Sequence, residues 1–354
     1  MADPTLRKGT NLHRKRFVGL ALAAVFAAVA TGLTSSASAS DANGSITGAG
    51  SSLMAPLMAK WQADFELKNN IKVTYGSVGS GAGIAQITAR TVDFGASDAP
   101  LTGPQRGACN RCYQIPWALT ATGIAFHLDG IRKLKLTGPI VAGIYLGQIT
   151  NWSDPKIKKI NPGVNLPNLK ITPAYRSDGS GDTYAFTDYL SRVSKTWKRK
   201  VGFSTQVSFP TGVGGKGNDG LTAIVTSTNG AISYISASYI IAHNLGAAAL
   251  QNRAGRFEYP NLKNIAAAAK GVKIGRFNEM HIVNPPKSKK SAYPLSTFSY
   301  VIVPKTTPKK DLLSKFILYA MGAGQKFGAA LDFAPIPKVV LNAGKATVKQ
   351  FQQG

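Results

Sequence analysis

Residues 176–183 combine side chains that bind anions with a turn that would gather them at one point. The segment follows a short apolar run and precedes an amphipathic helical pattern at 184–193, which predicts a strand, a glycine turn and a helix start. Free backbone N–H groups and the positive end of the helix dipole meet at such a turn and favour an anion. Arg176 adds a planar guanidinium suited to phosphate or carboxylate. The alternative is an ordinary helix start capped by Asp178 or Ser180.

Other segments of similar composition strengthen the anion-binding interpretation. Glycine-serine turns at 48–53 and 76–83 each follow a strand-like run and open a helical pattern, and a further segment, 92–98, ends in the carboxylate of Asp98. Short apolar strands alternate with helical patterns along the chain, which indicates an α/β fold with largely parallel sheets. Because ligands of open α/β sheets bind at the carboxyl ends of strands, we expect these turns to line one cleft.

Together the segments resemble the phosphate-specific substrate-binding proteins of bacterial phosphate ABC transporters. The resemblance runs in order from about residue 45 to about residue 340, which is nearly the whole chain after its N-terminal segment. Each segment alone is weak evidence for this family, but the combination and order of the segments are specific to it. The segments that carry the resemblance are 47–50, 92–101, 177–181, 214–220 and 331–337.

The resemblance implies a two-lobed α/β fold of the type II periplasmic-binding-protein (Venus-flytrap) kind, with the ligand in a cleft between the lobes. Two hinge crossings are expected, near residues 116–122 and 293–299. Lobe I then consists of residues 41–118 and 296–354, and lobe II of residues 119–295. Periodicity alone does not establish this discontinuous division.

The resemblance also implies which residues bind phosphate. Asp98 accepts a hydrogen bond from a phosphate O–H, and Arg176, held by Asp178, pairs with a phosphate oxygen. Ser52 and Leu53 stand where the family often has threonine and phenylalanine, and a hydroxyl and a backbone N–H serve there equally well. The full expected set is Ser52, Leu53, Ser80, Asp98, Arg176, Asp178, Ser180, Gly181, Asp182 and Thr183.

Asp182 departs from the resemblance, because the family usually has threonine at this position. An ionised carboxylate cannot donate a hydrogen bond and repels a dianion. Two arrangements remain open. Asp182 turns away to cap the helix while Thr183 donates instead, or Asp182 accepts a second phosphate proton.

The implied function is capture of inorganic phosphate without chemistry and its delivery to an ABC transporter permease. We expect no cofactor, no metal and no enzymatic activity. The sequence has no G-x-S-x-G nucleophile elbow, no H-E-x-x-H pair and no phosphate loop. Three alternatives remain open: a secreted phosphatase on the same scaffold, an envelope-interaction or adhesive protein, and the binding of another oxyanion such as sulfate, molybdate or tungstate.

A further glycine-rich segment, 212–217, formally satisfies G-x-G-x-x-G. It follows Pro210 and Thr211 rather than a clear strand, so we do not expect a dinucleotide site. The next two residues, Asn218 and Asp219, are expected to cap a helix, and a ligand role for Asp219 stays open as the alternative.

The N-terminal segment predicts export. Residues 14–16 are basic, residues 18–33 are apolar, and residues 37–39 are small, which is the pattern of a signal peptide at 1–39 cleaved near Ala39. The alternative is an uncleaved membrane anchor, although the apolar run is short for a spanning helix. We expect a periplasmic or cell-envelope-associated protein.

The charge of the chain is far from balanced. The formal net charge is +26, and the leader holds five basic residues and one acidic one, so the remainder keeps +22. The basic residues are scattered rather than gathered in a stripe, so nucleic acid is not an expected partner. We favour association with an anionic cell-envelope polymer or lipid and long-range attraction of anions, and adaptation to an acidic exterior stays open. A monomer is expected.

The two cysteines, Cys109 and Cys112, have the spacing C-x-x-C. In an exported chain this spacing predicts a local disulfide, whereas in a cytosolic protein it would suggest a redox motif. Two thiols do not complete a zinc site, and no histidine lies near them in the sequence. His127, His243 and His281 are isolated from one another and are expected to be structural.

Overall fold

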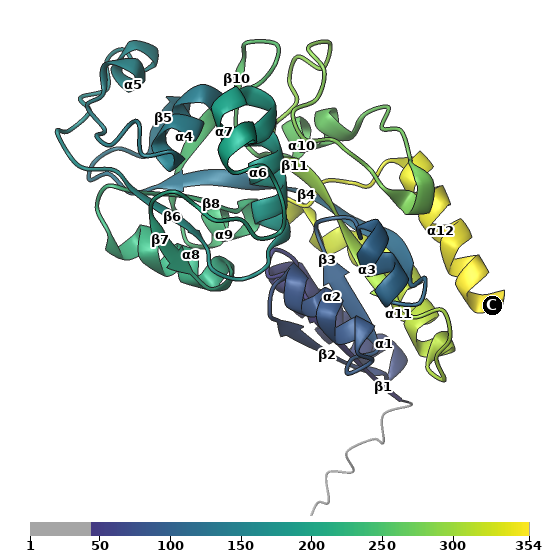
Figure 1. Ribbon diagram of the computed structural model, residues 1–354. Helices are drawn as coiled ribbons and strands as arrows, with labels where there is room; N and C mark the ends of the chain where they lie inside the picture. Colours follow the sequence, from purple (N-terminus) through teal and green to yellow (C-terminus); the bar gives the residue numbers. More distant parts are fainter. Residues whose placement is uncertain (1–43, 354) are drawn as a thin grey trace, which may run out of the picture. The chain divides into compact units, whose positions relative to one another are not determined.

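The computed structural model describes residues 44–353 (Figure 1). The predicted signal peptide, residues 1–39, and its cleavage point near Ala39 lie outside the described residues. Within residues 44–353 no helix combines the length and the apolar character that crossing a membrane requires.

Strands from both halves of the sequence join one mixed sheet in the order β2-β1-β3-β11-β4-β8-β6-β7, and β9 pairs with β4, β5 and β10. The first three strands pair in parallel, as the sequence predicts. The bounds are β1 Ser45–Gly50, β2 Lys72–Ser77, β3 Phe94–Ser97, β4 Tyr113–Phe126, β5 Lys133–Leu136, β6 Thr172–Arg176, β7 Val213–Gly215, β8 Ala231–Ser236, β9 Gly246–Gln251, β10 Phe257–Glu258 and β11 Ser296–Val303.

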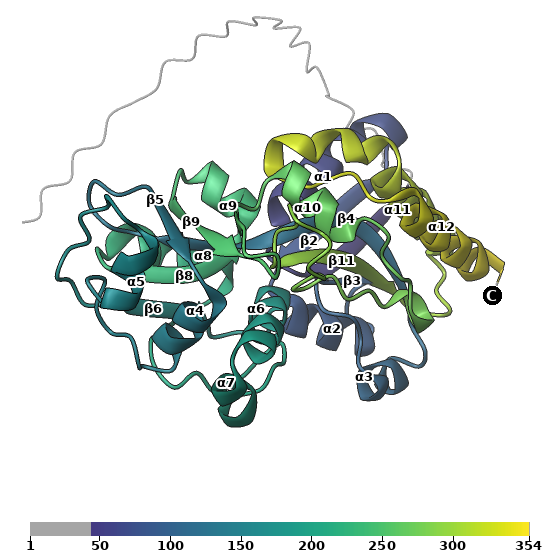
Figure 2. The same ribbon diagram turned by 90° about the horizontal axis from the view of Figure 1, so that it is seen from above.

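Helices alternate with the strands and cover the faces of the sheet (Figures 1 and 2). The α-helices are α1 Ala55–Asn69, α2 Ser80–Thr88, α3 Gly103–Ala108, α4 Gly138–Tyr145, α5 Pro155–Ile160, α6 Gly181–Val193, α7 Lys195–Lys200, α8 Gly217–Ser227, α9 Ala237–Ala242, α10 Leu262–Ala269, α11 Lys310–Met321 and α12 Lys338–Gln353. Short 3₁₀ helices are η1 Arg276–Asn278, η2 Ala323–Phe327 and η3 Ala329–Leu331.

Helix α1 shows how the sequence directs this packing. Leu57, Met58, Trp61 and Phe65 recur at helical spacing and are buried, so one stripe of the helix faces the core. The helix ends where Asn70 adopts a left-handed conformation with φ 51°, a residue type that tolerates this backbone better than most.

The long strand β4 connects two hydrophobic cores. Its residues 113–121 pair with β11, and its residues 122–126 pair with β8. One core surrounds the edge-to-face pair of Trp61 and Trp117, with ring centroids 5.3 Å apart. The other core contains Phe186 and Tyr234, which stack at 4.3 Å.

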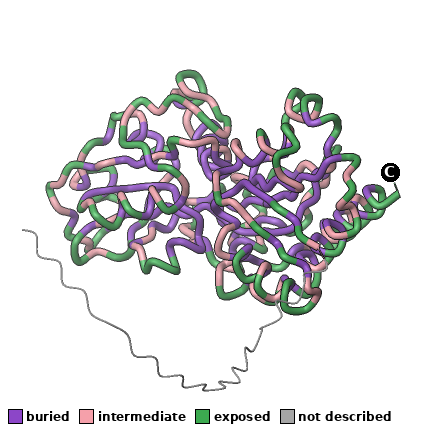
Figure 3. Tube along the Cα trace, turned by 90° about the horizontal axis from the view of Figure 1, so that it is seen from below, coloured by how far each residue is buried: buried purple, intermediate pink, exposed green. Residues whose placement is uncertain are grey.

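The buried parts of the chain follow the strands that surround the two cores, and exposed loops lie around them (Figure 3). Helices α1, α2, α11 and α12 pack around β1 to β3 and β11, and helices α4 to α9 around β5 to β9 (Figure 2). The fold is therefore a two-lobed α/β fold. The lobe boundaries at 41–118, 119–295 and 296–354 stay predictions.

The loop between α3 and β4 contains the predicted disulfide. Cys109 and Cys112 are bonded to each other, which confirms that expectation. The preceding helix α3 begins with a capping box formed by Thr102 and Gln105, as is usual at a helix start. The guanidinium of Arg90 lies 3.5 Å and 3.4 Å from the two cysteine sulfurs.

Candidate anion-binding site

The predicted glycine turns meet at one place although they are far apart in the sequence. The backbone N–H of Gly181, at the start of α6, donates to the hydroxyl oxygen of Ser80 at the start of α2, with a distance of 3.1 Å. The backbone N–H of Asn218, in the first turn of α8, donates to Ser52 Oγ at 3.2 Å. The turns after β1, β2, β6 and β7 therefore form one buried polar cluster.

The start of α6 lies directly against the end of β3. A Cβ atom at Gly181 would come within 2.5 Å of the Asp98 Cβ atom, so only glycine permits this approach. Ser80 Oγ also accepts the backbone N–H of Asp98 at 3.3 Å and thereby joins the two segments. Ser180 caps the helix by accepting the N–H of Thr183 at 3.3 Å, so the capped-helix alternative also describes this turn.

Arg176 ends strand β6 with a side chain that is only 1% exposed. Its Nε donates to Asp178 Oδ1 at 2.7 Å, and its Nη2 donates to Asp178 Oδ2, which is a bidentate pair. Partial burial acts to raise the pKa of Asp178, but the guanidinium and the N–H of Gly217 outweigh burial and hold that pKa below its usual value.

Asp182 points into the same cluster. Its Oδ1 accepts from Thr122 Oγ1 at 2.6 Å, and its Oδ2 accepts from Asn218 Nδ2 at 2.8 Å and from Arg176 Nη1 at 3.4 Å. Burial raises the pKa of Asp182, whereas the charge of Arg176 lowers it. Asp182 therefore does not turn away to cap the helix, since Ser180 does this.

Asp98 keeps one carboxylate oxygen free. The hydroxyl of Ser51 donates to Asp98 Oδ2, while Oδ1 is buried and has no partner in hydrogen-bond geometry among the described residues. The hydroxyl of Ser299 lies near enough to lower the pKa of Asp98. Burial and then the nearby charge of Asp182 raise the pKa of Asp98 to about 7. We call Arg176, Asp98, Asp178 and Asp182 the Arg176 cluster. Near neutral pH it holds a buried, partly protonated carboxyl group with an acceptor position to offer.

The remaining predicted residues border this cluster. Ser52 Oγ accepts from both the backbone N–H and the side-chain amide of Asn218, at 3.2 Å and 3.0 Å. Leu53 is fully buried and packs into the core around Trp61. Thr183 Oγ1 lies 2.8 Å from the hydroxyl of Tyr234.

Four polar residues that contact the Arg176 cluster are not among those predicted from the sequence: Ser51, Thr122, Asn218 and Tyr234. The expectation that Asn218 caps a helix is wrong, because Asn218 lies inside α8 and connects Ser52, Asp182 and the backbone N–H of Ser236. The sequence signal that could have indicated Asn218 as a site residue is its position in a glycine turn after a short strand. Nothing in the sequence indicates Tyr234, whose hydroxyl accepts the backbone N–H of Arg176 at 2.9 Å.

Three carboxylates and one guanidinium make up the Arg176 cluster, so its side chains alone do not attract an anion. An anion here needs backbone N–H groups and hydroxyls as donors, and a proton of its own to meet Asp98. The described residues contain no group of histidine, cysteine, aspartate and glutamate side chains arranged to hold a metal ion.

Comparison with known proteins places the chain. It matches the PBP superfamily domain over residues 35–323. The phosphate-binding protein PstS of Xylella fastidiosa is 39% identical over 299 residues, which cover 82% of this chain and 81% of the relative. The chain belongs to the PstS phosphate-binding protein family. PstS of Pasteurella multocida is 37% identical, with 86% of this chain and 90% of that relative covered.

Solved structures agree with this PstS assignment at the level of the fold. A high-affinity periplasmic phosphate-binding protein solved with bound phosphate has a TM-score of 0.70 at 20% identity and covers 85% of this chain, with 93% of its own length matched. A phosphate-binding protein from Stenotrophomonas maltophilia has a TM-score of 0.66, the same identity and the same coverage. The expected two-lobed periplasmic-binding-protein fold is thereby confirmed.

Proposed function

We propose that the chain binds inorganic phosphate at the Arg176 cluster, outside the cytoplasm, for delivery to an ABC transporter permease. The observation that carries this proposal is the free, buried Oδ1 of Asp98 beside the capped start of α6. A phosphate O–H donates to this oxygen, and the positive end of the α6 dipole favours the anion. The N–H groups of Gly181 and Thr183 exchange their bonds to Ser80 and Ser180 for phosphate oxygens. The relatives named phosphate-binding proteins support the same ligand.

The cluster selects its ligand through a proton. Phosphate carries an O–H near neutral pH, whereas sulfate does not, so sulfate would place an acceptor against the acceptor of Asp98. Where Asp98 is ionised, this repulsive contact disfavours sulfate more than it disfavours phosphate. Arg176 pairs with a phosphate oxygen while Asp178 holds the guanidinium in place. The ten residues from Ser52 to Thr183 named above form the proposed site.

We infer capture and release without covalent chemistry. The hydroxyls of Ser51, Ser52 and Ser80 are bonded to a carboxylate, an amide or backbone N–H groups, and none of these is a histidine base. A secreted phosphatase would need an activated nucleophile here. The relatives are named binding proteins, which supports a transport role.

The location follows from the N-terminal sequence. We propose cleavage near Ala39, release as a monomer into the periplasm or cell envelope, and contact with anionic envelope polymer or lipid through the net charge of +22 of the remaining chain. The permease is the proposed protein partner.

Calorimetric titration of residues 40–354 with phosphate, arsenate and sulfate tests the proposal. Phosphate and arsenate both carry a proton near neutral pH, so we expect both to bind and sulfate not to bind. Equal affinity for sulfate and phosphate would overturn the proposed selection by Asp98. Phosphatase activity that depends on one of the three serines would overturn the assignment as a binding protein.

A further inference from the structure

A second place in the molecule has the properties of an anion site, and none of the proposed phosphate-binding residues lines it. A cavity of about 680 Å³ lies beside α7 and the end of α6. Pockets for drug-sized ligands have volumes of about 300–1,000 Å³. The cavity therefore has room for a molecule larger than a single phosphate ion.

Positive charge dominates this cavity. Lys195 and Lys198 line it from α7 and Arg253 from the loop after β9, and these three exposed side chains have no ion-pair partner among residues 44–353. Arg192 also lines it and pairs with Asp188 at 2.8 Å, so the only carboxylate among the lining residues is compensated. We call this space, with its three uncompensated cations, the basic cavity.

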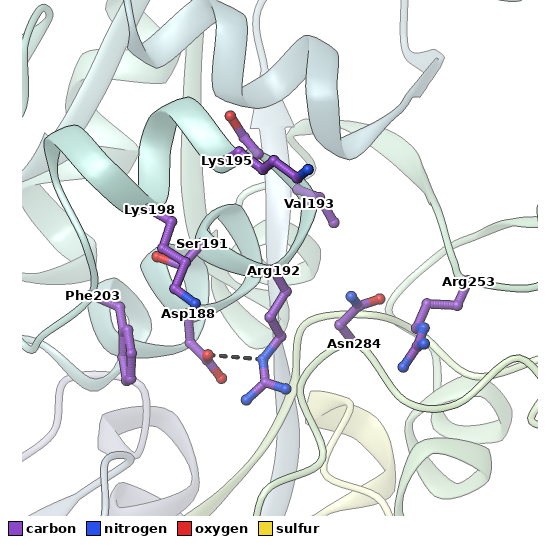
Figure 4. A pocket seen from close by; sticks show the side chains of 10 residues that line it. Asp188, Ser191, Arg192, Val193, Lys195, Lys198, Phe203, Arg253 and Asn284 are labelled. Carbon is purple, nitrogen blue, oxygen red and sulfur yellow. Dashed lines mark hydrogen bonds and ion pairs between the residues drawn. The ribbon is translucent and has the colours of Figure 1, made fainter.

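Figure 4 shows how these charges are distributed. The facing side chains of Asp188 and Arg192 lie between Phe203 on one side and Asn284 and Arg253 on the other. Lys195 and Lys198 are three positions apart, so both project from one side of α7. The cations come from two separate elements, α7 and the loop after β9, which suits a ligand of several linked phosphoryl groups better than a single phosphate ion.

A buried hydroxyl adds a specific contact. Ser191 lines the cavity, is only 9% exposed, and its Oγ has no hydrogen-bond partner within the described part of the chain. Its neighbour Thr187, one turn earlier in α6, instead donates to the carbonyl of Thr183 at 2.7 Å, which is the usual intrahelical bond. Leaving a buried polar group unpaired is costly. The Ser191 Oγ itself has almost no exposed surface, so its side chain rotates to meet a ligand oxygen in the cavity.

We propose that the basic cavity binds a short chain of linked phosphoryl groups, separately from the phosphate site at the Arg176 cluster. The lysines and Arg253 contact successive phosphoryl groups, and Ser191 donates to one of their oxygens. Two sources share this chemistry: inorganic polyphosphate and the phosphate chain of a nucleotide. Phe203 is 50% exposed at the edge of the cavity and offers a stacking surface to a nucleobase only.

Calorimetry on residues 40–354 tests the proposal while saturating inorganic phosphate keeps the first site filled. The probes are tripolyphosphate and ATP. The cavity variant is the double substitution Lys195→Gln, Lys198→Gln. The control is Lys158→Gln, Lys159→Gln on α5, which removes the same charge from exposed positions that do not line the cavity.

We expect the cavity variant to lose about tenfold or more in tripolyphosphate affinity, since charge-assisted hydrogen bonds are lost. The control should change little. Ser191→Ala should weaken binding several-fold without lowering the melting temperature, because the hydroxyl has no partner in the folded chain. Phe203→Ala should weaken ATP alone if a nucleotide is the source, and neither probe if the source is polyphosphate.

Two results would overturn the proposal. One is the absence of binding of either probe to the phosphate-saturated protein. The other is an equal loss of affinity in the cavity variant and the control, because the probes would then respond only to overall charge.

Discussion

The Arg176 cluster and the basic cavity differ in their burial and in the balance of their charged side chains. The Arg176 cluster is buried and has more carboxylates than cations, although the whole chain carries a formal net charge of +26. The basic cavity is open and has three uncompensated cations. Under the proposed function, hydrogen-bond direction decides which anion fits the buried cluster, because donors and acceptors there cannot turn to water. In the open cavity, the number of ligand charges decides.

The largest expected effect comes from removing the one cation of the buried cluster. Arg176→Met leaves Asp178 and Asp182 without their guanidinium partner, and we expect phosphate binding to lose roughly 2–5 kcal/mol. Arg176→Lys should not restore the affinity fully, since a point charge lacks the planar fork that meets Asp178 at two atoms. Titration calorimetry measures both variants. Near-normal affinity in the lysine variant would show that backbone N–H groups dominate.

The second prediction concerns selectivity. Asp98→Asn replaces the free acceptor by an amide that also donates, so sulfate no longer meets an obligatory acceptor. We expect sulfate to bind about tenfold or more tightly than before, with a smaller loss for phosphate. Competition of sulfate against bound phosphate measures the ratio. An unchanged ratio would mean that Asp98 does not read the phosphate proton.

The third prediction uses the pKa of Asp98 in the protein without ligand. That pKa is raised from 3.8 to about 7, so the folded chain holds the proton more strongly than the unfolded chain. Stability from this group is fully present below about pH 4 and is lost as the pH rises through about 7.

In phosphate-free buffer, the free energy of unfolding measured with urea should therefore contain a part that falls between pH 4 and pH 8. Asp98→Asn should remove this part. The difference between the pH profiles of the two proteins reports Asp98 together with its interaction with Asp182. Profiles that run parallel would refute the raised pKa.

A smaller effect is expected from Asp182. The carboxylate of Asp182 lies in the cluster, and when it is ionised it repels the phosphate dianion more than the monoanion. For phosphate esters the dianion replaces the monoanion near about pH 6. Phosphate affinity should therefore rise as the pH falls through this range. Asp182→Thr should flatten that profile and strengthen binding at alkaline pH. Calorimetry from pH 5 to 9 at fixed ionic strength measures this, and unchanged pH dependence in the variant would leave Asp182 a structural role only.

The smallest expected effect is a difference in the salt dependence of binding between the Arg176 cluster and the basic cavity. Exposed charges are screened over about 10 Å at 0.1 M salt, and buried charges much less. Raising the salt concentration should weaken tripolyphosphate binding at the basic cavity more than phosphate binding at the Arg176 cluster. Chloride is the suitable salt, since sulfate tests selectivity at the same time. Equal slopes for the two ligands would mean that salt screens the charges of both sites alike.

Local features of the fold were predictable from the sequence. The apolar run before Arg176, the glycine turn and the amphipathic pattern after it correspond to β6, the site turn and α6. Each depends on neighbours within a few residues, which a periodic pattern records. The disulfide between Cys109 and Cys112 was predictable for the same reason.

Contacts between distant segments were not predictable. Thr122 donates to Asp182 across 60 positions, and Tyr234 meets Arg176 across 58. No local pattern encodes such pairs, because they depend on which strands lie side by side. The orientation of Asp182 stayed open for this reason: Thr122 and Asn218 supply its partners from other strands and helices.

The hydroxyl of Ser80 has one further consequence. Its single oxygen accepts two amide hydrogens, from Asp98 and from Gly181, which lie far apart along the chain. A motion that separates α2 from α6 breaks the Gly181 bond, together with the bond from the Gly81 N–H to the Gly179 carbonyl at 2.9 Å. The rate of hydrogen–deuterium exchange at the Gly181 amide therefore reports how often the two segments separate, without an attached label or a bound ligand.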